Sequence, residues 1–357
     1  MKKSMKARAI ALAMFCCMLV TVLPVQNVQA QVYNSTLQFG TGYQFTGEGG
    51  SQKFDLVLPK SGRVTFNFIV EDNGDDTGIF LYDSACTNQL YYGGFYGSYK
   101  CDIDLKAGEY VVFFGRAGSY GSNVDGWPYD KAPAKGQMVA TFTDANETFA
   151  ESTLITNDES GVASEIGNIG SANIVGQFAV NDSVDYYSFD VKKSQNITIS
   201  YVAPMSSSSL HIYKDTLDLE NWQNDLAAGS HKVTLTFPEG HYYIAINNNS
   251  NVTGVYNLTM SGAKISTANI KSLRSTAKKS ITVKYGKVSS VDKYQIQIAA
   301  NSKFTKSVKT YTTTATSKKI TKLSSKKKYY VRVRTITMAK DYKCYSDWSK
   351  AKSVKVK

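Results

Sequence analysis

The chain has 357 residues, of which 42% are hydrophobic and 20% are charged, and its formal net charge is +12. This composition is typical of a globular protein and excludes a disordered or fibrous chain. The 24 tyrosines and 16 phenylalanines favour β-strands, while only three histidines (His211, His231 and His241) leave little material for imidazole catalysis or a histidine-rich metal site.

Residues 1–30 have the pattern of a secretory signal peptide. Four basic residues precede an apolar run from Ala9 to Leu23, which is shorter than the roughly 20 residues that a membrane span needs. Small residues before Gln31 fit the cleavage rule, so we expect an exported mature chain that begins at Gln31 and has no transmembrane segment. An uncleaved membrane anchor is the alternative interpretation.

Three cysteines follow this leader: Cys86, Cys101 and Cys344. Export favours disulfides, and a Gly/Tyr-rich stretch between Cys86 and Cys101 allows the chain to turn back on itself. We therefore predict a Cys86–Cys101 bridge, which leaves Cys344 without a partner. Two free buried thiols are the alternative, because the sequence does not give the separation of the two Cα atoms.

Charge divides the chain near residue 262. Residues 31–261 carry 12 Lys and Arg against 26 Asp and Glu, whereas residues 262–357 carry 25 against three, so their net charges are −14 and +22. Such a basic region attracts polyanions in a salt-dependent way. We predict that it binds an anionic cell-wall polymer and tethers the chain to the envelope. The alternative is a lysine-rich surface that only keeps the module soluble.

The acidic region contains an internal repeat. Three aromatic landmarks recur at nearly one offset, together with their flanking patterns, and both halves close with Gly-x-x-x-x-Thr. The landmark pairs are Phe54 and Phe189 (135 positions apart), Tyr82 and Tyr213 (131), and Tyr110 and Tyr242 (132). We therefore predict two similar domains, residues 31–143 and 144–262.

Short segments of alternating polarity run through the whole chain. Ile197, Ile199 and Tyr201, for example, alternate with Thr198 and Ser200, which is the period of a half-buried strand. No helical pattern of 12 or more residues occurs. The prediction is an all-β chain, with one sandwich for each half of the repeat.

The second half of the repeat resembles the bacterial pre-peptidase C-terminal domain, a family that includes the collagen-binding domains of clostridial collagenases. The similar runs are DANETFAES at 144–152, GQF at 176–178, DSVDYYSF at 182–189, EGHYYI at 239–244 and YNL at 256–258. Residues 38–143 are similar more loosely. The resemblance implies a jelly-roll-like antiparallel sandwich, a secreted context, and ligand binding without catalysis.

The resemblance also implies a calcium site where the entering linker meets the sandwich. By position, the candidate ligands are Asp144, Asn146, Glu147, Asp182 and Asp185, all of which offer side-chain oxygens. The sequence departs from the family because Ala145 stands where a proline is usual, and the first half lacks a matching motif. The alternative is that these residues cap a short turn and lie in a solvated loop.

Residues 263–357 resemble a fibronectin type III domain. Leu323 precedes Tyr329 by six positions, followed by alternating valines, which is similar to the tyrosine corner of that fold. Tyr285 replaces the usual core tryptophan, and no Arg-Gly-Asp sequence supports integrin binding. The predicted polyanion-binding residues of this module are Lys326, Lys327, Lys328, Arg332 and Arg334.

No catalytic motif occurs, but aromatic residues crowd two predicted loops of the first domain. Exposed rings suit sugar faces or extended peptides, because they bury a large area with little loss of entropy. The predicted ligand-binding residues are Tyr92, Tyr96, Tyr99, Trp127 and Tyr129. The alternative is that half of these rings alternate into the core.

These observations predict a secreted, non-enzymatic binding protein of a Gram-positive-type bacterium, located outside the cell and at its wall. Its partners would be an extracellular glycan or a matrix protein, and calcium is the one candidate cofactor. An accessory, non-catalytic component of an exported hydrolase system and a structural spacer are the two alternatives.

Overall fold

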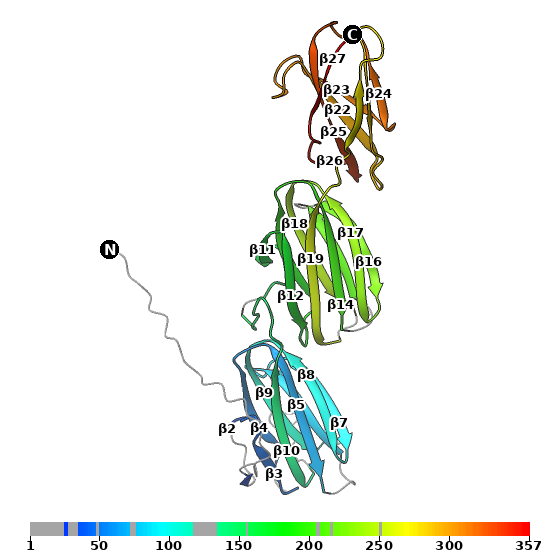
Figure 1. The fold of residues 1–357 in the computed structure, drawn as a ribbon. Helices are drawn as coiled ribbons and strands as arrows, with labels where there is room; N and C mark the ends of the chain where they lie inside the picture. Colours follow the sequence, from blue (N-terminus) through cyan, green and yellow to red (C-terminus); the bar gives the residue numbers. More distant parts are fainter. Residues whose placement is uncertain are drawn as a thin grey trace, which may run out of the picture.

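The structure is a computed structural model that describes residues 25–27, 35–47, 50–71, 76–116, 134–154, 156–204, 208–214, 217–249 and 252–357. These residues form three β-sandwiches stacked end to end, and no α-helix occurs among them (Figure 1). The predicted all-β sandwich fold is therefore confirmed. The predicted signal peptide lies outside the described residues, apart from a three-residue strand.

The first sandwich consists of two five-stranded sheets, with strand orders β1-β3-β10-β5-β8 and β2-β4-β9-β6-β7. Alternation places Phe54, Leu56 and Leu58 of β4 inside, against Phe66 and Phe114. The strands are β1 Val25–Asn27, β2 Ser35–Thr36, β3 Gly42–Phe45, β4 Gln52–Leu58, β5 Gly62–Val70, β6 Asp76–Asp83, β7 Gln89–Tyr96, β8 Tyr99–Leu105, β9 Gly108–Arg116 and β10 Gly136–Asp144.

The second sandwich pairs a five-stranded sheet, β11-β13-β18-β15-β16, with a four-stranded sheet, β12-β19-β14-β17. Ile197, Ile199 and Tyr201 are fully buried in its core, as their alternation predicts. The elements are a 3₁₀ turn at Ser160–Val162 and the strands β11 Ser164–Asn168, β12 Ser171–Phe178, β13 Val184–Val191, β14 Gln195–Ala203, β15 Ser208–Lys214, β16 Leu217–Leu226, β17 Gly229–Phe237, β18 Gly240–Asn248 and β19 Gly254–Lys264.

The repeat corresponds to a shared topology. In both sandwiches the first strand of one sheet pairs in parallel with the next, β2 with β4 and β11 with β13, and the strands that follow are in the same order. The equivalent tyrosines Tyr110 and Tyr242 make the same contact, because each hydroxyl donates to the carbonyl oxygen four residues before it, at 2.8 Å. The aromatic landmarks therefore mark equivalent positions in two copies of one strand arrangement.

The third sandwich pairs the sheet β20-β21-β24 with a second sheet in which β23, β22, β25 and β26 follow one another and β27 also joins β25. The predicted tyrosine corner is present, since the backbone N–H of Ser324 donates to the Tyr329 hydroxyl at 3.3 Å. Tyr285 is buried against Tyr294. The strands are β20 Ile270–Arg274, β21 Ile281–Tyr285, β22 Lys293–Ala299, β23 Lys309–Thr313, β24 Ser317–Ile320, β25 Lys328–Ala339, β26 Tyr342–Tyr345 and β27 Lys352–Lys355.

The predicted Cys86–Cys101 disulfide is wrong. Cys101 lies on β8 and faces the core of the first sandwich, where burial raises the pKa of its thiol to about 12. Cys86 follows β6 and packs with Phe80 and Phe113, which lie on the outer face of the opposite sheet. A sheet therefore separates the two sulfur atoms, and both cysteines are free, as is Cys344.

This arrangement predicts that reducing agent does not change the thermal midpoint of the mature chain, because no covalent crosslink constrains the unfolded state. After denaturation without reductant, alkylation and mass spectrometry should detect three reactive thiols, which are the three free cysteines. A product carrying a single alkyl group would mean that only one thiol is free, and would contradict the absence of a disulfide.

Candidate cation site at the junction of the first two domains

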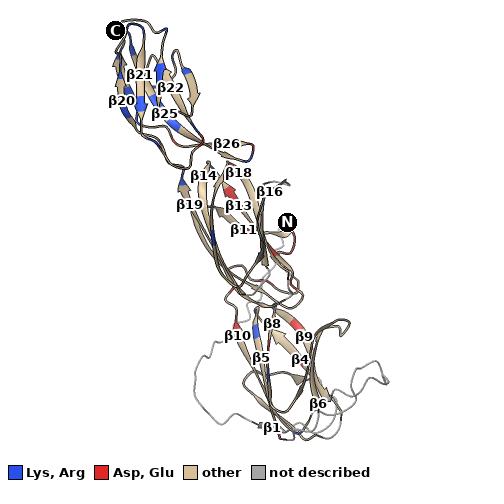
Figure 2. Cartoon of the chain, turned by 90° about the vertical axis from the view of Figure 1, so that its right-hand side faces the viewer, with Lys and Arg blue, Asp and Glu red and all other residues tan. Residues whose placement is uncertain are grey.

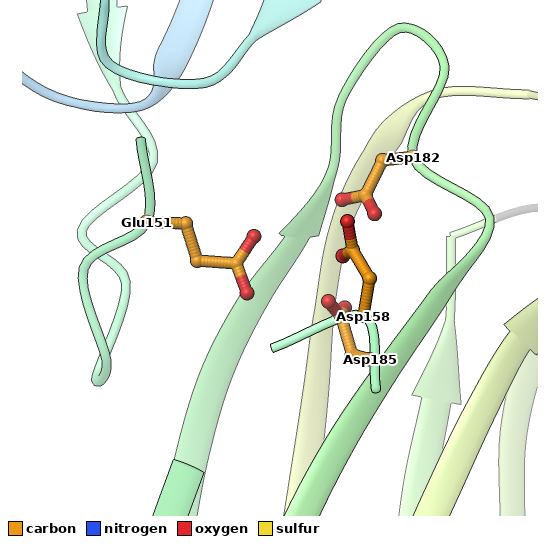
Figure 3. A group of neighbouring side chains, drawn as sticks. All are labelled: Glu151, Asp158, Asp182 and Asp185. Carbon is orange, nitrogen blue, oxygen red and sulfur yellow. The ribbon is translucent and has the colours of Figure 1, made fainter. Parts of the chain in front are cut away.

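Four carboxylates converge at the end of the second sandwich that meets the first. One oxygen from each of Glu151, Asp158, Asp182 and Asp185 lies within 4.8 Å of the others. Figure 3 shows Glu151 reaching from one side towards the three aspartates. Glu151 and Asp158 belong to the linker between β10 and β11, Asp182 to the turn before β13, and Asp185 to β13 itself.

The alternation of β13 explains how a carboxylate becomes buried. Tyr187 and Phe189 face the core, so Asp185 at the same parity also faces inward and is 1% exposed. Its Oδ2 accepts a hydrogen bond from the Tyr256 hydroxyl at 2.5 Å, and Tyr256 in turn contacts the Tyr187 hydroxyl at 2.5 Å. Gly176 makes room for this chain, because a Cβ there would lie 2.3 Å from the Tyr256 hydroxyl oxygen.

A lysine from the first sandwich enters the cluster. The Nζ atom of Lys106, in the turn between β8 and β9, lies 3.0 Å from Glu151, 3.1 Å from Asp158 and 3.3 Å from Asp182. Burial opposes the charge of Lys106, but the attraction of Asp182 and Glu151 outweighs it, and the pKa of Lys106 is raised. The ammonium is therefore held in its charged form among the carboxylates.

The carboxylates themselves are driven towards their protonated forms. Burial raises the pKa of Asp182 to about 8 against the opposing attraction of Lys106. Burial, followed by repulsion from Asp182 and Glu151, raises the pKa of Asp185 well above its ordinary value. The cluster therefore compensates its negative charge with retained protons as well as with the lysine.

A second buried charge lies beside the cluster and belongs to the first sandwich. Asp104, at the end of β8, is 1% exposed and accepts two hydrogen bonds from Arg63, at 3.0 and 2.8 Å. The second sandwich donates two more, from the Gln177 amide at 3.0 Å and the Thr253 hydroxyl at 2.8 Å. The backbone N–H of Val180 also donates to the Asp104 carbonyl oxygen at 2.9 Å, so this short stretch is bonded to the second sandwich at several points.

The donor set matches a hard cation such as calcium, but the space does not. Carboxylate oxygens are the ligands that calcium prefers, and Asp185 Oδ1 is buried without a hydrogen-bond donor among the described residues. Three of the four carboxylates, however, already contact the Lys106 ammonium. As this structure arranges the cluster, a metal ion and the lysine would compete for the same oxygens.

The predicted calcium ligands divide into two groups. Asp182 and Asp185 lie in the cluster, whereas Asp144 pairs with Lys60 at 2.7 Å and accepts from the Asn146 backbone N–H at 2.8 Å. That second bond is the turn-forming role that was the alternative interpretation. Glu147 accepts from the backbone N–H of Glu151 at 3.4 Å, and neither it nor Asn146 belongs to the cluster.

Sequence reasoning missed Glu151 and Asp158. The available signal was weak: Glu151 lies within the DANETFAES run, and Asp158 follows seven positions later, in a polar linker. Lys106 gave no signal at all, because it belongs to the other half of the repeat.

Three of the predicted ligand-binding aromatic residues are described, and they are arranged unequally. Tyr92 and Tyr96 are 47% and 71% exposed and lie on one face of the edge strand β7, with Gly94 between them. Tyr99 stacks on the buried Phe95, with ring centroids 4.6 Å apart, and one face of the Tyr92 ring stacks on the buried Phe80, at 4.8 Å. Trp127 and Tyr129 lie outside the described residues.

The predicted polyanion-binding residues also divide. Lys326, Lys327 and Lys328 are exposed in the turn before and at the start of β25. Arg332 stacks on Phe304 and Trp348, at 4.1 and 4.5 Å from the ring centroids, and Arg334 stacks on Tyr345 and Trp348, at 3.8 and 4.4 Å. Each guanidinium also donates to a glutamine side chain of β22, so both arginines are committed to a cation–π ladder.

One part of the chain matches a known protein family. Residues 183–262 match the model of the bacterial pre-peptidase C-terminal domain. This region contains β13 to β18 and most of β19, including Asp185, and the match does not extend over the first sandwich. No curated protein matches the chain.

Two solved structures of single domains are similar to part of the chain. One is the pre-peptidase C-terminal domain of a collagenase from Bacillus anthracis, with 23% identity, 28% of this chain and 93% of that chain covered, and a TM-score of 0.25. The other is the sixth fibronectin type III domain of human fibronectin type III domain containing protein 3, with 15% identity, coverages of 27% and 88%, and a TM-score of 0.22. Within the described part of the chain, no helix is long and apolar enough to cross a membrane.

The raised pKa of Asp182 predicts a pH-dependent stability. Between about pH 4, where the unfolded carboxyl titrates, and the folded value of about 8, the folded state binds the extra proton. The free energy of unfolding should therefore fall as pH rises through this window, by at most about 1.4 kcal/mol per pH unit for one proton.

Urea unfolding at pH 5, 6, 7 and 8 measures this slope. Asp182→Asn should flatten it, whereas Asp102→Asn, which changes an exposed aspartate of β8, should leave it unchanged. Parallel profiles for the wild type and Asp182→Asn would contradict the assignment.

Proposed function

We propose that this chain is an extracellular, non-enzymatic binding protein of the bacterial cell surface, tethered by its third domain to an anionic polymer. The observation that carries the proposal is an uncompensated cationic face on the three-stranded sheet β20-β21-β24. The match of residues 183–262 to the pre-peptidase C-terminal family supports an extracellular location.

The cationic face follows from the strand register. Inward-facing Ile281 and Val283 leave the intervening positions on the outside, where Arg274, Thr282 and Lys319 form one row and Lys284 lies in the next. All three cations are exposed, and Lys271 lies nearby on β20. The strands contain no acidic residue, and Figure 2 shows the basic residues concentrated on this domain. The positive electrostatic potential of such a face attracts negatively charged, phosphate-bearing polymers.

The opposite sheet is less suited to this role. Arg332 and Arg334 are stacked between rings and hydrogen-bonded to Gln297 and Gln295, so recruiting them would break the ladder. Lys326, Lys327 and Lys328 remain available at the edge and extend the charge that a polymer meets. The binding site is therefore assigned to β20-β21-β24, with this turn as its margin.

The first domain supplies a second binding feature. Tyr96 and the outer face of Tyr92, whose other face stacks on Phe80, are exposed on one side of an edge strand, with Gly94 between them. Flat rings at this spacing suit the apolar faces of a glycan or an extended peptide. In this proposal the first domain contacts the external ligand while the third domain anchors the chain.

Binding to purified poly(glycerol phosphate) teichoic acid tests the tether. At about 50 mM salt the mature chain should bind. About 500 mM salt should abolish binding, because salt at that concentration screens the attraction between the exposed cations and the anionic polymer. Replacing Lys271, Arg274, Lys284 and Lys319 by glutamine should weaken binding at least tenfold.

A matched control removes the same charge from the other sheet and its loop, by replacing Lys293, Lys303, Lys306 and Lys309 with glutamine. Its loss should be smaller. Equal losses would contradict a localised face, and a wild type that does not bind at low salt would contradict the tether. Turnover of polysaccharide or protein substrates by the pure chain would contradict the non-enzymatic role.

A further inference from the structure

We propose that Lys106 is the permanent cation of the acidic cluster, so that the first sandwich, and not a metal ion, completes this end of the second sandwich. The inference is independent of the proposed polymer binding. It rests on the distances, the burial and the backbone contacts of one turn.

The lysine occupies the position that a bound ion would need. Its Nζ lies within 3.3 Å of oxygens of Glu151, Asp158 and Asp182, which come from separate points of the chain. The side chains of Glu151 and Asp182 are 5% and 0% exposed, and that of Lys106 is 12% exposed. A divalent ion bound to the same oxygens would lie next to the Lys106 ammonium. Two positive charges so close together in a buried site repel each other strongly.

The backbone around Lys106 prevents the lysine from withdrawing easily. Its own carbonyl oxygen accepts from the Tyr110 hydroxyl at 2.8 Å. Ala107, the next residue, bridges to Ser152, and its carbonyl oxygen accepts from the Thr153 N–H at 2.8 Å. On the other side, the Asp104 carbonyl oxygen accepts from Val180. To remove the ammonium from the cluster while this backbone stays bonded, the side chain would have to leave an almost closed site.

The remaining oxygens indicate what the cluster would do without the lysine. Asp185 Oδ1 is buried and receives no hydrogen bond from a described residue. With Lys106 removed, four converging carboxylates would be left without a neighbouring ammonium, and hard oxygens in that arrangement bind calcium. Lys106 therefore makes the junction independent of calcium, and its loss should create calcium dependence.

The test compares thermal melts of the full mature chain in EDTA and in 5 mM calcium. The wild-type midpoint should be the same in both, and calorimetric titration with calcium should give no binding. Lys106→Met should lower the midpoint in EDTA by about 5 °C or more, because a buried ion pair has lost one partner. Calcium should restore most of that loss and should bind measurably to this variant.

Lys60→Met is the matched control, because Lys60 pairs with Asp144 outside the cluster. It should show no calcium dependence. Lys106→Arg keeps the charge and should stay calcium-independent, which preserves the test if the methionine variant does not fold. Three results would each overturn the inference: a wild type stabilised by calcium, a methionine variant with an unchanged midpoint in EDTA, or a destabilised variant that calcium does not rescue.

Discussion

The junction between the first two sandwiches depends on two opposite charges, one at the end of β8 and one in the turn that follows it. Asp104 and Lys106 are two positions apart, both are largely buried, and each finds partners in the second sandwich. Burying a charge without a partner costs roughly several kcal/mol of folding free energy. While the two sandwiches are docked, Lys106, Asp104 and Asp182 are each compensated in part by groups across the junction, so losing one partner would leave a buried charge without full compensation. The two domains are best understood as one structural unit.

Most of the fold was predictable because its causes are local. Alternation over five or six residues fixes which side chains of β4 or β14 face inward, and the equivalent tyrosines Tyr110 and Tyr242 identified the repeat that the shared topology confirms. The tyrosine corner at Tyr329 is equally local. These features can be predicted because the inward and outward positions of a strand follow from its own alternation of residues.

The site was only half predictable because its causes are distant. Asp182 and Asp185 follow from the family motif, whereas Lys106 precedes them by more than 70 positions and belongs to a separate domain. A motif describes one domain in isolation and is silent about what is docked against it. Cys86 and Arg334 illustrate a related limit, because the sequence shows which residues are near in the chain but not which face of a sheet they occupy. Cys86 lies on the outer face of its sheet and so cannot reach Cys101. Arg334 lies on the same face as Trp348 and stacks on it.

The two joints of the rod differ in kind, and this difference bears on the proposed function. Between the second and third sandwiches, the ion pairs join Lys193 and Lys264 to Asp347, and all three side chains are largely exposed. A pocket of about 200 Å³ is also lined by residues of both sandwiches, among them Phe237 and Tyr342. Exposed pairs contribute little and are weakened by salt. The second joint should therefore be the more compliant one. A basic domain on such a joint can orient its cationic sheet towards an anionic polymer without disturbing the acidic pair of sandwiches, whose buried charges hold them in one arrangement.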